Sequence, residues 1–98
     1  MISLSLEAET QVDQLIAFYE AKGRVAAAVN LLNALERAKL RIARTPEAGL
    51  EAPRPYPALK CFGRRWIIEG RYWISYSLTT PAVISGVFYV TADIPNRV

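Results

Sequence analysis

The first half of the chain contains two stretches in which apolar residues recur every three or four positions. In residues 7–22 these positions fall on one face and hold Val12, Leu15, Ile16 and Tyr19. In residues 24–44 a second such face holds Ala28, Leu31, Leu32, Leu35, Ala38 and Ile42. This spacing predicts two amphipathic helices. Gly23 lies between them and suits a helix end, so we expect an antiparallel helical hairpin.

Alternating and β-rich stretches predict four strands around this hairpin. Residues 2–6 alternate apolar and polar side chains. The other three stretches are rich in β-branched and aromatic residues and span 65–68, 71–78 and 82–90. Glu69-Gly70 suits a tight turn between the first two of them. The order β-α-α-β-β-β predicts an α+β fold, in which an N-terminal strand and the antiparallel helical hairpin pack on a small antiparallel sheet.

The middle strand of the predicted sheet has two chemically different faces. We expect the more apolar face to lie against the helices, and it holds Tyr72, Ile74, Tyr76 and Leu78. We expect the other face to be accessible, and it holds Arg71, Trp73, Ser75 and Ser77. The helix residues expected to be buried against the sheet are Leu15, Tyr19, Leu31 and Leu35. The proline-rich stretch 45–63 is expected to be an ordered or semi-extended loop and not a domain linker, and the tail 91–98 is expected to lack a regular element.

Composition limits the chemistry available to the chain. Its 98 residues suit a single domain, residues 1–98. Without histidine, and with Cys61 as the one cysteine, no Ser-His-Asp triad, internal disulfide or cysteine-ligated metal site can form, and we expect no cofactor. The net charge of +3 suits an acidic partner or is ordinary solubility charge. With no signal peptide or membrane-spanning stretch visible, we expect a cytoplasmic protein with no membrane contact.

Three local motifs follow one another along the chain from Arg44 onward. The segment RTPEAG at 44–49 resembles a helix end followed by Phe-Pro-Glu-Leu-Gly. GRYWISY at 70–76 resembles Gly-Arg-Tyr-Leu-Ile-Phe-Tyr. VFY at 87–89, with DIP at 93–95, resembles Val-Leu-His followed by Arg-Asp-Ile-Pro. Over nearly its whole length, the chain therefore resembles the RelE/ParE toxin superfamily, and its ParE-like subgroup in particular.

The resemblance implies a toxin of a type II toxin–antitoxin system, neutralised by a cognate ParD-like antitoxin. ParE-like members inhibit DNA gyrase by binding, whereas RelE-like members cleave mRNA on the ribosome with cationic residues and a tyrosine near the C-terminus. Where RelE-like nucleases carry cations, this chain has Trp66, Trp73 and Ala92, although Arg64 keeps a charge near one such position. No tyrosine follows Tyr89. We therefore expect a gyrase inhibitor with no catalytic residue.

Two groups of residues are candidates for binding. For the target they are Arg64, Arg65, Arg71, Trp73 and Tyr89, and we expect the three arginines to lie close together at one end of a hairpin. An exposed tryptophan is typical of binding hot spots. For the antitoxin they are Leu15, Tyr19 and Leu32, as part of a groove for a partner helix. Solvated strand ends and ordinary core packing are the structural alternatives.

Two other functions remain open from the sequence. One is a RelE-like, ribosome-dependent mRNA endoribonuclease. The other is an attenuated family member that has lost toxicity and survives as an interaction module. Direct nucleic-acid binding, the identity of the antitoxin and the stoichiometry of the complex are open as well.

Overall fold

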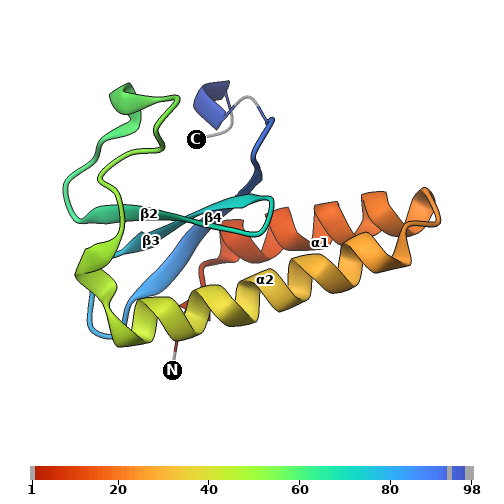
Figure 1. The fold of residues 1–98 in the computed structure, drawn as a ribbon, viewed down its shortest axis with the longest axis horizontal. Helices are drawn as coiled ribbons and strands as arrows, with labels where there is room; N and C mark the ends of the chain where they lie inside the picture. The colour runs from red at the N-terminus through yellow and green to blue at the C-terminus, as the bar shows by residue number, and fades with distance from the viewer. Residues whose placement is uncertain (1, 93, 97–98) are drawn as a thin grey trace.

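The protein folds into a helical hairpin that covers one face of a four-stranded sheet (Figure 1). This computed structural model describes residues 2–92 and 94–96. The main elements are β1 (Ser3–Leu4), α1 (Leu6–Ala21), α2 (Val25–Arg44), β2 (Arg64–Glu69), β3 (Tyr72–Ser77) and β4 (Val83–Tyr89). The expected α+β order of one strand, two helices and three strands is confirmed.

The strands lie side by side in the order β1-β4-β3-β2. Both β2 with β3 and β3 with β4 pair antiparallel, as their short connections predict. β1 instead pairs in parallel with β4, through Ser3 with Val83 and Leu4 with Ile84. The sheet is therefore mixed, with both helices, β2 and β3 lying between its two parallel strands in the sequence.

Local sequence signals set the ends of the helical hairpin. The Oγ of Ser5 accepts a hydrogen bond from the N–H of Ala8 at 3.2 Å, so Ser5 caps α1 and the expected first strand is shortened. Gly23, with a φ of +67°, reverses the chain between the helices. Thr45-Pro46 ends α2, because the residue before a proline avoids helical backbone angles. No helix in the described ranges is long and apolar enough to cross a membrane.

The larger hydrophobic core lies between the helical hairpin and the sheet. Tyr19, Leu31 and Leu35, three of the four helix residues expected there, are buried. The fourth, Leu15, packs against the same core but stays partly exposed. From the sheet, β3 contributes its expected face, which holds Tyr72, Ile74 and Tyr76.

The middle of the opposite face of the sheet is also buried, so the expectation that this face is accessible is wrong for Trp73 and Ser75, whereas Arg71 at its end is exposed. Trp73 and Ser75 are only 4% and 3% exposed. The second, smaller core on this side consists of Trp66, Trp73, Phe88 and Ile94. The loop between α2 and β2 closes over it, because Leu50 and Trp66 exchange two backbone hydrogen bonds of 2.7 Å. Figure 1 shows this loop and the C-terminal segment on the side of the sheet away from the helices.

The C-terminal segment takes part in this second core. Ile94–Asn96 form a short 3-10 turn, which corrects the expectation that the tail has no regular element. Ile94 is fully buried beside the tryptophans, and this apolar contact holds the segment in place. Residues 93 and 97–98, which belong to the same expected tail, lie outside the described residues.

A side chain of α1 protects part of the open edge of β4. β1 pairs with β4 only at Val83 and Ile84 in the described structure. Farther along β4, the N–H of Val87 donates a hydrogen bond to the side-chain Oε1 of Gln11 at 2.8 Å. A helix side chain thus occupies a position that a further strand would take.

Leu31 and Leu40 provide a matched test of which side of α2 faces the core. Leu31 is fully buried and Leu40 is 69% exposed. We expect Leu31→Ala to lower the free energy of unfolding by about 2–5 kcal/mol, and Leu40→Ala by less than about 0.5 kcal/mol. Urea denaturation followed by circular dichroism measures both values. Equal losses at the two positions would contradict the described packing.

Candidate binding groove

A groove of about 710 Å³ lies where the tip of the helical hairpin meets the end of the sheet. Its walls come from the α1–α2 turn, the first turns of α2, the β2–β3 turn and the adjoining ends of β3 and β4. This volume falls within the range of ligand sites. The described lining contains no carboxylate but holds three tyrosines and three arginines: Tyr19, Tyr72, Tyr89, Arg24, Arg37 and Arg71. We call it the Tyr–Arg groove.

The three tyrosines form a connected group. The hydroxyls of Tyr19 and Tyr72 lie 2.5 Å apart, within hydrogen-bond distance, and both side chains are buried. The ring of Tyr89 meets that of Tyr72 edge to face, with the ring centroids 5.7 Å apart. Because Tyr19 belongs to α1 and Tyr72 to β3, their hydrogen bond joins the helical hairpin to the sheet.

Burial keeps Tyr72 in its neutral form. The pKa of Tyr72 is raised well above its usual value near 10. The larger cause is the loss of solvent around the phenol, and the second is the hydrogen bond with Tyr19. The hydroxyl therefore keeps its proton into more alkaline solution than a free tyrosine does.

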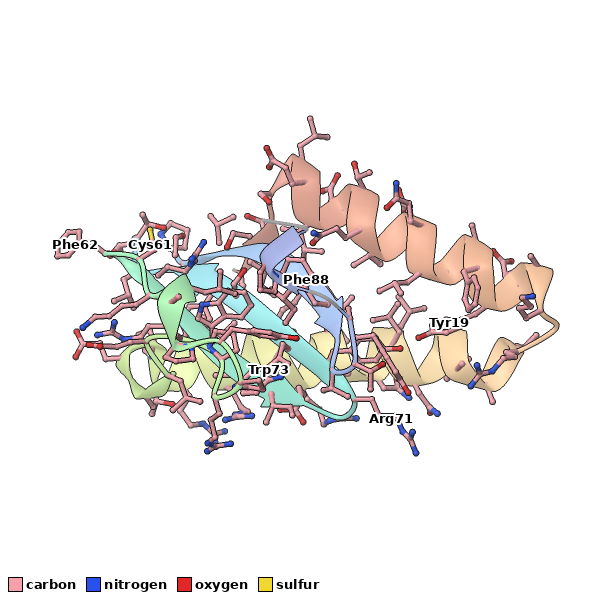
Figure 2. The ribbon with its side chains drawn as sticks, turned by 90° about the horizontal axis from the view of Figure 1, so that it is seen from above. Tyr19, Cys61, Phe62, Arg71, Trp73 and Phe88 are labelled. Atoms are coloured by element: carbon pink, nitrogen blue, oxygen red, sulfur yellow. The ribbon has the colours of Figure 1, made fainter. Side chains whose placement is uncertain are left out.

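Two arginines face the groove without an ion-pair partner among the described residues. The guanidinium of Arg24 lies over the ring of Tyr19, 5.7 Å from the ring centroid. Arg71 donates from Nη1 to the hydroxyl of Tyr89 at 3.4 Å, a long hydrogen bond. In Figure 2, Arg71 and Tyr19 lie toward the same end of the molecule. The groove therefore has a positive electrostatic potential that attracts anions.

Arg37, the third arginine, is paired with Glu69. Its Nε lies 2.9 Å from Oε1 of Glu69, and Nη1 of Arg41 lies 3.0 Å from Oε2. Burial acts to raise the pKa of Glu69, but the hydrogen bonds and charges of the two arginines outweigh it, and the pKa is lowered. This carboxylate thus ties the β2–β3 turn to α2 and leaves Arg24 and Arg71 as the unpaired cations of the groove.

The structure separates the three arginines that we expect to lie together at one hairpin end. Arg64 pairs with Ser77 at the start of β2, whereas Arg71 lies in the turn at its other end. A strand of six residues spans about 17–20 Å, so the expected cluster is wrong. Figure 2 shows Arg71 at the opposite end of the molecule from Phe62, which lies just before β2. Arg64 and Arg65 are also partly buried.

Of the other two target-binding candidates, only Tyr89 lines the Tyr–Arg groove. Trp73 pairs with Phe88 across β3 and β4 and lies with it in the second core (Figure 2). Its burial under the loop leaves too little surface for a contact hot spot. Tyr89 stays partly exposed beside Arg71.

The three antitoxin-binding candidates do not share one pocket. Tyr19 lines the Tyr–Arg groove. Leu15 lines an adjoining pocket of about 200 Å³ that also contains Tyr19 and Phe18. Leu32 lines neither pocket and is 48% exposed on α2.

Of the six tyrosines and arginines in the groove, Arg24, Arg37 and Tyr72 are not among the candidates from the sequence. A signal for Arg24 exists, because it stands at a helix start where Ser, Thr, Asp or Asn is usual and contributes no capping hydrogen bond. Tyr72 could have been noted as a residue on the core face with a polar end that needs a partner. No group of three or more potential metal ligands of the His, Cys, Asp or Glu type occurs within the described ranges.

Comparison with known proteins does not supply a relative. No known family model matches the chain, and no curated protein matches its sequence.

The tryptophan fluorescence tests whether the second core is closed. Trp66 and Trp73 are the two tryptophans of the chain, and both are buried. We expect a blue-shifted emission that iodide quenches far less than the emission of the protein unfolded in guanidinium chloride. Quenching of the folded protein to half the unfolded level or more would show that one indole is exposed.

Alkaline unfolding tests the burial of the tyrosine hydroxyls. Burial raises the pKa of Tyr72 and of Tyr76 in the folded protein, so above about pH 10 these tyrosines ionise first in the unfolded chain. The free energy of unfolding should then fall with rising pH, by up to about 1.4 kcal/mol per pH unit for each such tyrosine. Tyr72→Phe should show a shallower fall than the parent. Identical slopes above pH 10 would contradict the raised pKa of Tyr72.

Proposed function

We propose that the protein is a ParE-like toxin that inhibits DNA gyrase by binding it and is neutralised by a cognate ParD-like antitoxin. The motif resemblance provides the starting point. The observed order of one strand, two helices and three strands agrees with the layout that this resemblance implies. The motif GRYWISY extends from the β2–β3 turn through most of β3, so it forms most of an inner strand of the sheet.

The observation that carries the proposal is the closed second face of the sheet. Trp66 and Trp73 stand where RelE-like nucleases carry cations, and both are buried. The Nε of Arg64 is buried as well. RNA cleavage needs cations arranged around the scissile phosphate, and this face presents a covered apolar core instead. Binding to a protein target is therefore favoured over cleavage of RNA.

Exposed apolar residues on α2 support a protein partner. Val25, Val29 and Leu32 are about half exposed or more. Their spacings of four and three residues place them on one side of the helix. Such a surface suits the apolar face of a partner helix. We assign it to the antitoxin, with Leu32 as a central contact.

A gyrase assay tests the proposed target. The purified protein should inhibit supercoiling and cause linear plasmid to accumulate, and primer extension on a translated message should show no ribosome-dependent cuts. Arg71 is exposed at the β2–β3 turn, so Arg71→Gln should weaken inhibition about three- to tenfold, mainly through slower association at low salt. Arg44→Gln removes the same charge at the far end of α2 and serves as the control.

Two outcomes would replace the proposal. Codon-specific cuts that require ribosomes would favour the RelE-like nuclease. Unaffected gyrase, together with binding of the antitoxin encoded beside the gene, would favour the attenuated interaction module. In that second case, Leu32→Glu should still weaken antitoxin binding.

A further inference from the structure

The Tyr–Arg groove combines two unpaired cations with unused hydrogen-bond donors, and its described lining contains no carboxylate. We propose that it is a binding site for an oxyanion: the phosphate or carboxylate group of a ligand that also carries an apolar or aromatic body. This site is argued from the groove alone and does not require the gyrase or antitoxin proposal, although Arg71 belongs both to the groove and to the proposed gyrase contact.

Arg24 and Arg71 supply the charge from two different elements. Arg24 stands at the start of α2 and Arg71 in the β2–β3 turn, so an anion between them contacts both the helical hairpin and the sheet. The planar guanidinium group matches the paired oxygens of a carboxylate or phosphate. Arg37 stays with Glu69 and is not needed for this contact.

The first turn of α2 supplies backbone donors. Val25 and Ala26 line the groove, and their backbone N–H groups have no hydrogen-bond acceptor among the described residues. The side chain of Arg24 does not cap the helix, and the first turn holds no acidic residue. The partial positive charge of a helix N-terminus therefore adds to that of the arginines.

The pair of tyrosine hydroxyls supplies a further hydrogen-bond donor to the groove. Tyr19 and Tyr72 carry two hydroxyl protons but share one hydrogen bond, and the second proton has no acceptor among the described residues. Both side chains are more than nine-tenths buried and line the groove. Whichever hydroxyl donates within the pair, the proton of the other is free to donate to a ligand in the groove. An oxyanion supplies the missing acceptor, which a cationic ligand cannot do.

The adjoining pocket indicates the rest of the ligand. This pocket of about 200 Å³ shares Tyr19, Arg24 and Tyr89 with the groove and adds Leu15 and Phe18. Phe18 is about half exposed, so a ligand can still cover it. An anion attached to an apolar body therefore gains hydrophobic contact that a bare anion lacks.

An NMR titration of the ¹⁵N-labelled full chain tests the site. The probes are inorganic phosphate, phenyl phosphate, acetate and 3-phenylpropionate, each at the same ionic strength. We expect amide shifts concentrated at Val25, Ala26 and Arg71. Each phenyl-bearing probe should bind at least about threefold more tightly than its small counterpart and also shift Phe18. The tighter of the two phenyl-bearing probes identifies the preferred anion as phosphate or carboxylate.

Matched variants separate this site from general charge attraction. Combining Arg24→Gln with Arg71→Gln should weaken phenyl phosphate binding at least about tenfold, whereas Arg44→Gln should leave it unchanged. Combining Tyr19→Phe with Tyr72→Phe removes both hydroxyls without orphaning either one, and should weaken binding about two- to tenfold. Thermal unfolding confirms that each variant is folded. If a double variant does not fold, the affinity for phenyl phosphate is measured for each of its single substitutions instead.

Two results would overturn the oxyanion site. The first is a set of shifts spread over exposed arginines in general, with Arg44 affected as strongly as Arg71. The second is unchanged affinity in the folded Arg24 and Arg71 variants. The gyrase assay is read separately. If the protein binds phenyl phosphate but does not inhibit gyrase, the oxyanion site is supported and the proposed function is contradicted.

Discussion

Burial of β3 on both faces is the constraint on which the rest of the structure depends. Five of its six residues are buried, and β2 and β4 pair with it on either side. Among the described residues, both α1 and α2 lie on one face of the sheet, and irregular segments cover the other face. Loop 45–63 and Ile94 provide that cover. These segments are therefore part of the packing rather than simple connections.

The sequence predicts the helical hairpin and the order of strands well, because those signals are local. Period-two alternation in β3 shows which face is more apolar, but it does not show whether the other face is covered. The cover over Trp73 comes from Leu50 and Ile94, which belong to segments without any periodic pattern. Only tertiary packing brings these segments to the sheet. The face that the pattern predicts to be accessible is therefore part of a second core in the structure.

The candidate site shows the same division between local and long-range information. The distance between Arg64 and Arg71 follows from strand length and rise, so the expected cluster of arginines could have been rejected from the sequence. The presence of Arg24 and Tyr72 in one groove could not have been predicted from the sequence, because it requires the tip of the helical hairpin to lie over the end of the sheet. Tyr19 is a candidate for antitoxin binding in the sequence, yet it lines the same groove, where it is hydrogen-bonded to Tyr72.

The contact between Gln11 and Val87 links the docking of a helix to the protection of a strand edge. Unpaired strand edges are templates on which another chain can add its own strand. Here a side chain of α1 covers one position on the β4 edge, the N–H of Val87, so this position stays covered only while α1 lies against the sheet. A fluctuation that lifts α1 uncovers apolar core and pairing-competent backbone in the same event. Self-association of this protein should therefore start from a partly opened form and be limited by how often α1 detaches.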